Sequence, residues 1–216
     1  MAASSPAPVV TFGADAGADV RVEDLVLDEL ARASFRVRTP WGDAAVRLAV
    51  SGAHMATNAA AAIAAAGVVG VDVAAAADAL GAATMSAARM DVVRVASGGV
   101  VINDAYNANP TSMTAALHAL AAVEGTRRVA VLGPMAELDD PDVAHREIAG
   151  VARELGAELV AVGTDRYGIE PVDREAVADV VGPITPGTVV VVKASNAGGL
   201  QAVAAALIAA AGGPAD

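Results

Sequence analysis

The spacing of polar and apolar positions changes along the chain, and each pattern predicts different elements. Before residue 50 the apolar runs are short or alternating and are bounded by Gly, Pro and Asp, which is typical of strands. The TPWGD sequence at residues 39–43 indicates a hairpin turn between two of them. Four strands are therefore predicted, at residues 9–13, 24–30, 35–40 and 44–50.

The pattern changes after residue 54, where helix-forming residues become continuous. One helix is predicted over 55–66 and a second over 72–83. Asp72 is a suitable N-cap for the second helix because its carboxylate can accept from a free amide of the first turn. Gly81 is predicted to end that helix.

From about residue 90 strands and helices alternate. Strands are predicted at 90–96, 99–105, 127–133, 157–163 and 187–195, and helices at 110–123, 140–155, 173–181 and 198–210. A Gly98–Gly99 turn joins the first two strands, and Thr111 or Ser112 is the expected cap of the helix that begins near Pro110. This alternation is typical of an α/β fold with a mostly parallel sheet and helices on both faces.

A domain boundary is expected in the TMSAARM stretch, residues 84–90, which gives a first part of residues 1–88 and a second of residues 89–216. The first part reads as short strands and two helices without a clear sheet order, so it is expected to be an incomplete domain. The second part could fold alone. The strand edges of an incomplete first part would invite pairing with another chain, so a homodimer is expected.

Polar residues and glycines follow four of the predicted strands of the second part. They are Asp104, Gly133 with Glu137, Gly163 with Asp165, and Lys193 with Ser195. Each alone is more often a turn or cap residue. Together they predict a ligand crevice, because parallel strands place ligands at their carboxyl ends.

Two residues at this edge have side chains suited to a nucleotide. Asp104 can accept hydrogen bonds from ribose hydroxyls, and Lys193 can bind phosphate or carboxylate. Lys193 is the only lysine among 14 basic residues, although a surface position at the end of a strand would explain it equally well.

Composition excludes several classes of function. The net charge of −11 argues against nucleic acid and against an anionic membrane surface. The chain has no cysteine, no opening signal sequence and no convincing membrane span, so a cytoplasmic location without membrane insertion is expected. The histidines (His54, His118 and His145) lack metal-site spacing, so no metal ligands are assigned and His118 and His145 are expected at surface or packing positions. No phosphate-binding loop or serine-hydrolase motif is present.

Three segments resemble the Mur ligase family. DAYNANPTSM, AVLGPMAEL and HREIAGVARELGAELVAVGT are similar to its Rossmann-like C-terminal domain, and YNANPTSM to its D-alanyl-D-alanine-adding (MurF-type) branch. SGAHMATNAAAAIAAA is similar to the tail of the central, ATP-binding domain, so residues 1–88 would be a remnant of that domain. The resemblance implies an ATP-dependent ligase of peptidoglycan precursor synthesis, which forms an acyl phosphate that the amine of D-alanyl-D-alanine attacks, with ATP and Mg²⁺ as cofactors.

The resemblance also assigns roles to particular residues. They are Asn58 for adenine, Arg89 for a phosphate, Asp104 for the ribose, Tyr106, Asn107 and Asn109 for the substrate region, and Lys193 and Ser195 for catalysis. The sequence departs from the family in that the UDP-sugar domain, the phosphate-binding loop and the magnesium-binding positions are missing. In addition, KASN replaces the usual Lys-Gly-Ser-Arg, and MAELDD replaces the usual Glu-Leu-Gly. We therefore expect a piece of such a ligase that is inactive alone. The alternatives are a split enzyme completed by another chain, a non-catalytic binding or oligomerising module, and an amide ligase for a different amino acid.

Overall fold

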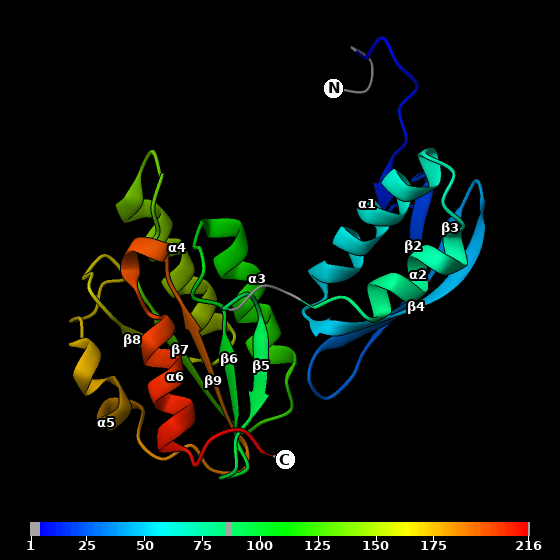
Figure 1. The fold of residues 1–216 in the computed structure, drawn as a ribbon. Helices are drawn as coiled ribbons and strands as arrows, with labels where there is room; N and C mark the ends of the chain where they lie inside the picture. The colour runs from blue at the N-terminus through cyan, green and yellow to red at the C-terminus, as the bar shows by residue number, and fades with distance from the viewer. Residues whose placement is uncertain (1–4, 85–87, 216) are drawn as a thin grey trace. The chain divides into compact units, whose positions relative to one another are not determined.

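A computed structural model describes residues 5–84 and 88–215. It divides into two compact units, one ending at Thr84 and one beginning at Met85. They are called unit 1 and unit 2 here (Figure 1).

Unit 1 is a four-stranded sheet with two helices. The strands are β1 (Phe12–Gly13), β2 (Val20–Leu27), β3 (Arg32–Thr39) and β4 (Gly42–Ser51), and the helices are α1 (His54–Val68) and α2 (Val73–Gly81). The strand order is β1-β2-β3-β4, with β1 parallel to β2 and the other pairs antiparallel. Both helices contribute buried side chains to one core with the sheet.

This order corrects the expectation of short strands without a clear arrangement. In β3 every second side chain is buried, including Phe35 and Val37, so one face of the sheet is specified by the period of two. The strand predicted at 24–30 was also misplaced, because β2 begins at Val20 and ends at Leu27. Asp28 ends it: its carboxylate accepts hydrogen bonds from the amide of Leu30 in the following turn and from that of Arg32 at the start of β3.

Local signals were confirmed at the hairpin and at α2. The Thr39 hydroxyl donates to the Gly42 carbonyl at 2.7 Å and accepts from the Trp41 amide at 3.0 Å, which closes the β3–β4 turn. Asp72 caps α2 by accepting from the Ala75 amide at 3.0 Å.

Unit 2 is a five-stranded sheet between two layers of helices (Figure 1). The strands are β5 (Asp91–Arg94), β6 (Val100–Asn103), β7 (Arg127–Leu132), β8 (Glu158–Ala161) and β9 (Thr188–Lys193), and the helices are α3 (Pro110–Ala122), α4 (Pro141–Glu154), α5 (Val177–Val181) and α6 (Gln201–Ala210). Short 3₁₀ turns at Arg174–Ala176 and Asn196–Gly198 precede α5 and α6. The strand order is β5-β6-β9-β7-β8; only the β5–β6 hairpin is antiparallel.

The central strands β6, β9 and β7 are largely buried on both faces, as the continuous apolar runs indicate, whereas the edge strand β5 is not. All six residues of β9 are buried. Its Val190 and Val192 belong to the core under α5 and α6, whereas α3 packs on β7 and β9 from the other face. The second part therefore has the predicted mixed α/β architecture, with β9 returning to the middle of the sheet.

The cap predicted for α3 was wrong by two or three residues. Asn109 is the N-cap and accepts from the Ser112 amide at 2.9 Å, while the Ser112 hydroxyl bonds back to the Asn109 amide at 3.1 Å. This reciprocal pair is a capping box, in which Ser112 occupies the third helical position and not the cap. Pro110 opens the helix, where its missing N–H leaves no bond unmade.

Candidate functional site

Four neighbouring strands of unit 2 end at one edge of the sheet. Asn103 pairs with Val192, and Leu132 pairs with both Lys193 and Ala161. Parallel strands in this register bring the residues that follow them together. The edge is therefore built from the ends of β6, β9, β7 and β8.

Asp104 and Lys193 form a buried ion pair at this edge. Lys193 Nζ lies 2.5 Å from Asp104 Oδ2, 2.8 Å from the Asn107 carbonyl oxygen and 3.3 Å from the Asp104 carbonyl oxygen. Lys193 is 2% exposed and Asp104 9%. Burying a charged ammonium is costly unless it is paired, and here its three protons meet three acceptors. Lys193 thus anchors the loop from Asp104 to Asn107 onto the central strand.

The other carboxylate oxygen of Asp104 holds the segment of unit 2 that precedes β5. Asp104 Oδ1 accepts from the Met90 amide at 2.9 Å, and the Tyr106 amide donates to the Ala88 carbonyl at 3.0 Å. Ala88 and Met90 both have positive φ, at 61° and 50°. Such a conformation is rare for residues with side chains, and these hydrogen bonds offset its cost.

Arg89, between these two residues, stacks on Tyr106. Its guanidinium carbon lies 3.8 Å from the centre of the Tyr106 ring, which is a favourable cation–π distance. Arg89 Nε is buried and has no hydrogen-bond partner among residues 5–84 and 88–215, whereas Tyr106 is 44% exposed. The pair therefore combines an incompletely satisfied cation with an exposed aromatic ring.

Ser195 is also at this edge but is buried. It is 3% exposed, and its amide donates to the Pro134 carbonyl at 2.9 Å. The Gly133 amide donates to the Lys193 carbonyl at 2.8 Å, so the chain after β7 continues alongside the chain after β9. A side chain at Gly133 would place its Cβ 2.7 Å from the Ala194 Cβ, so only glycine fits there.

The remaining predicted site residues have different surroundings. Asn107 is exposed and its carbonyl binds Lys193, while the Asn109 side chain is used as the α3 cap. Asn58 is exposed on α1 of unit 1, where its amide lies 3.5 Å from the sulfur of Met55. The structure thus joins Arg89, Asp104, Tyr106, Asn107 and Lys193 into one network within unit 2.

Two buried residues of this edge were missed as functional candidates. The His145 Nε2 atom lies 3.1 Å from the Met135 amide, and the Tyr167 hydroxyl donates to the Gly133 carbonyl at 2.7 Å. His145 could have been recognised, because it shares the buried face of α4 with Ile148 at i+3. Nothing in the local sequence marks Tyr167.

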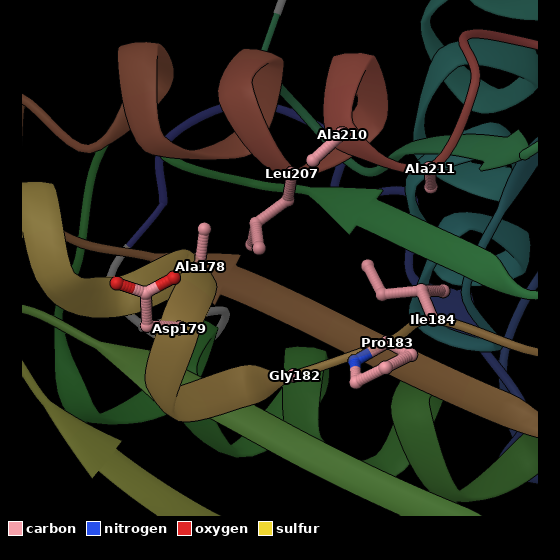
Figure 2. Close-up of a pocket in the computed structure, with 8 residues that line it drawn as sticks. All are labelled: Ala178, Asp179, Gly182, Pro183, Ile184, Leu207, Ala210 and Ala211. Carbon is pink, nitrogen blue, oxygen red and sulfur yellow. The ribbon is translucent and has the colours of Figure 1, made fainter.

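A separate pocket of about 480 Å³ lies between α5 and α6. Figure 2 shows Leu207 of α6 and Ile184 facing the same space. Pro183 and Ile184 precede β9, so the pocket lies toward the amino ends of the parallel strands. None of the predicted site residues lines it.

Within residues 5–84 and 88–215, no group of three or more His, Asp or Glu side chains could hold a metal ion. Over the same residues, no helix combines the length and apolar character needed to cross a bilayer.

Comparison with known proteins agrees with this architecture. Residues 88–182 match the family model of the Mur ligase glutamate ligase domain. The chain is 41% identical to the UDP-N-acetylmuramoyl-tripeptide–D-alanyl-D-alanine ligase of Mycobacterium tuberculosis, over 97% of this chain and 48% of that protein. The chain belongs to the Mur ligase family. The Bacillus subtilis ligase of the same name is 39% identical over 47% of this Mur ligase chain.

Solved structures show the same fold. A crystal structure of MurF from Acinetobacter baumannii superposes with a TM-score of 0.79 at 28% identity, covering 93% of this Mur ligase chain and 46% of that one. The MurF ligase of Thermotoga maritima in complex with ADP gives a TM-score of 0.77 at 21% identity. The chain spans about half the length of the relatives that it matches.

Proposed function

We propose that this chain is the C-terminal part of an ATP-dependent amide ligase that adds D-alanyl-D-alanine to UDP-MurNAc-tripeptide during peptidoglycan precursor synthesis. The similarity to relatives of that name supports the reaction. The observation that carries the proposal is the Asp104–Lys193 pair at the carboxyl edge of unit 2. It joins Asp104 and Asn107, to which the family resemblance assigns a nucleotide and a substrate contact, in one network.

In this proposal Asp104 binds the ribose of the nucleotide. Each of its carboxylate oxygens accepts one internal hydrogen bond and can accept another, because an ionised carboxylate offers about four acceptor positions. The Asp104 side chain is 12% exposed, so a hydroxyl can approach the free positions. All three protons of the Lys193 ammonium are used within the protein, so Lys193 acts by positioning the loop from Asp104 to Asn107. Ser195 acts by hydrogen bonding to the loop after β7.

Arg89 binds a phosphate of the nucleotide, with Tyr106 fixing the plane of its guanidinium. The buried Nε atom finds no acceptor in the part of the chain that the structure describes, which supports this assignment, since a buried donor without an acceptor is costly and an anion would satisfy it. Asn107 and Asn109 border the substrate.

ATP fits the donors and acceptors of this edge, and it would supply the phosphoryl group that activates a carboxylate. Magnesium does not fit the described residues of this chain alone, because they contain no cluster of three ligands. The metal site and the phosphate-binding loop would have to come from the part of the ligase that this chain does not match. A cytoplasmic location follows if this proposal holds, since the proposed substrates are precursors made there.

Ligase assays test the proposal. The chain alone should give no product, and adding the N-terminal half of the Mycobacterium tuberculosis relative should give product that depends on ATP and D-alanyl-D-alanine. Replacing Arg89 by Gln should abolish product formation in the mixture, while Arg94→Gln, an exposed arginine of β5, should leave it unchanged. Robust ATP turnover by the chain alone, or a mixture equally active with either variant, would overturn the proposal.

A second candidate function is a non-catalytic binding module. All three Lys193 protons bind acceptors within the protein, so the Lys193 ammonium is not directed at a substrate. This observation favours a binding module. A chain that binds ADP normally but never restores activity with an N-terminal half, although the two associate, would favour this candidate.

A further inference from the structure

The loop of residues 133–137, which follows β7 at the carboxyl edge, is held by hydrogen bonds from two directions. On one side the β9 segment binds it through the Gly133 amide and the Pro134 carbonyl, at 2.8 and 2.9 Å. On the other side two side chains bind it. The Tyr167 hydroxyl donates to the Gly133 carbonyl at 2.7 Å, and the His145 ring accepts from the Met135 amide at 3.1 Å.

The contacts of His145 determine its protonation state. Its Nδ1 lies 2.5 Å from the Pro141 carbonyl oxygen, which can only accept, so Nδ1 carries a proton. Its Nε2 faces the Met135 amide, which can only donate, so Nε2 must present its lone pair. His145 therefore holds the loop only as a neutral imidazole, because protonation of Nε2 would place two donors face to face.

The surroundings of His145 favour this neutral form. The side chain is fully buried, and burial is the main reason that its pKa lies below 6.5. Arg166, in the loop after β8, lowers the pKa further, while the Pro141 hydrogen bond and Asp142 oppose the shift. Arg166 and Asp142 are themselves paired at 3.0 Å.

Tyr167 completes the arrangement from the loop after β8. Its ring packs edge-on against His145, with ring centres 4.8 Å apart. Burial raises the pKa of its phenol, so the hydroxyl remains a donor to the Gly133 carbonyl throughout the neutral range. The two rings thus fix backbone groups on either side of Pro134 in one loop.

This loop ends at Glu137, whose backbone is strained. Glu137 has a φ of 59° and an exposed side chain, so the loop places a carboxylate at the solvent side of the edge in a conformation that few non-glycine residues adopt. A strained position of this kind persists only where its surroundings determine it. The hydrogen bonds to Gly133, Pro134 and Met135 provide that determination.

We propose that His145 and Tyr167 are positioning residues for the loop of residues 133–137, and that protonation of His145 releases this loop from its place at the carboxyl edge. The claim that this loop borders a ligand site rests on the proposed function. The claim that His145 and Tyr167 hold the loop in place is independent of it.

Amide hydrogen exchange followed by NMR or mass spectrometry tests the proposal on the full chain. After correction for intrinsic rates, exchange at Met135 should be about tenfold faster at pH 5 than at pH 7.5, as expected for the loss of one net hydrogen bond. Exchange in β9 should change much less, which separates release of the loop from global unfolding. Tyr167→Phe should speed exchange in the loop at both pH values while its dependence on pH remains.

Three variants of histidine sharpen the test. His145→Gln offers an amide oxygen near the position of Nε2, so Met135 should stay protected at both pH values. His145→Phe keeps a ring but offers no acceptor, so Met135 should exchange rapidly at both. His118→Gln, at the exposed histidine of α3, is the matched control and should behave as the wild type.

Equal Met135 exchange at pH 5 and pH 7.5 in the wild type would overturn the proposal, as would His145→Phe with wild-type protection. Measuring ADP binding on the same samples keeps the two claims apart. A wild-type chain that binds no ADP counts against the proposed function, while the exchange data still decide whether His145 positions the loop.

Discussion

Replacing Lys193 by Met tests whether the buried ammonium anchors the carboxyl edge. Methionine has a similar length and no charge, so packing against the sheet is largely kept. The change leaves the Asp104 carboxylate with the Met90 amide as its remaining protein donor and frees the Asp104 and Asn107 carbonyls.

The expected cost follows from the burial of the pair. Breaking a buried ion pair by removing one partner destabilises a protein by about 3–5 kcal/mol, because the other charge stays buried without compensation. Lys193 is 2% exposed, so solvent replaces little of the lost interaction. Adding Asp104→Asn removes the orphaned charge, and the double variant should recover about 1–2 kcal/mol relative to Lys193→Met alone.

Urea unfolding at pH 7 measures this cost. Far-UV circular dichroism follows both units, whereas the only tryptophan, Trp41, lies in unit 1 and reports on that unit. The dichroism transition of unit 2 should move to lower urea, while the fluorescence transition of Trp41 should keep its midpoint. A loss below about 1 kcal/mol, the range of an exposed ion pair, would refute the reasoning.

Three further predictions concern single positions. Gly133→Ala should lower stability by about 1–3 kcal/mol in the urea assay, because its Cβ would lie 2.7 Å from a neighbouring alanine methyl. Gly150→Ala should instead stabilise by up to about 1 kcal/mol, because an added Cβ would meet no atom of the described residues within 4 Å beyond the backbone of α4 itself. Asn109→Ala should cost about 1 kcal/mol through loss of the cap and should speed amide exchange in the first turn of α3, whereas Asn109→Asp should not. The hydrogen bonds from Arg127 lower the pKa of Glu158 below 4.5, so their stabilisation is present above pH 4.5 and is lost as pH falls through the lowered pKa. Glu158→Gln should remove this part of the acid dependence of stability, which is less than about 0.5 kcal/mol in the free energy of unfolding because the side chain is half exposed. Melting temperatures measured across the acid range check this, and an acid profile equal to that of the wild type would contradict the assignment.

The sequence was sufficient to predict the α/β architecture of unit 2, because apolar runs of strand length that alternate with helical segments are compatible with few other folds. It did not predict that β9 lies between β6 and β7, since strand order depends on which faces the crossover helices cover. In unit 1 the alternation in β3 indicates which face of the sheet is buried, but it does not give the strand order. Asp28 also ends β2 through a local turn that the apolar pattern alone does not reveal.

The candidate site was partly predictable for a similar reason. Strand ends indicated that Asp104 and Lys193 share one edge, but not that they would satisfy each other. That outcome depends on burial, which makes an unpaired lysine costly at this position. Asp104, His145 and Tyr167 each form a hydrogen bond with a backbone group that lies ten or more residues away in the sequence. No side-chain pattern encodes them.

The central claim is that the carboxyl edge of unit 2 binds a nucleotide. It is tested most directly by titrating the isotopically labelled chain with ADP and following its amide resonances. The account predicts that the largest shifts fall at residues 89–90, 104–109 and 193–196, and that Asp104→Asn weakens them. No shift at millimolar ADP, or shifts confined to the pocket between α5 and α6, would contradict it.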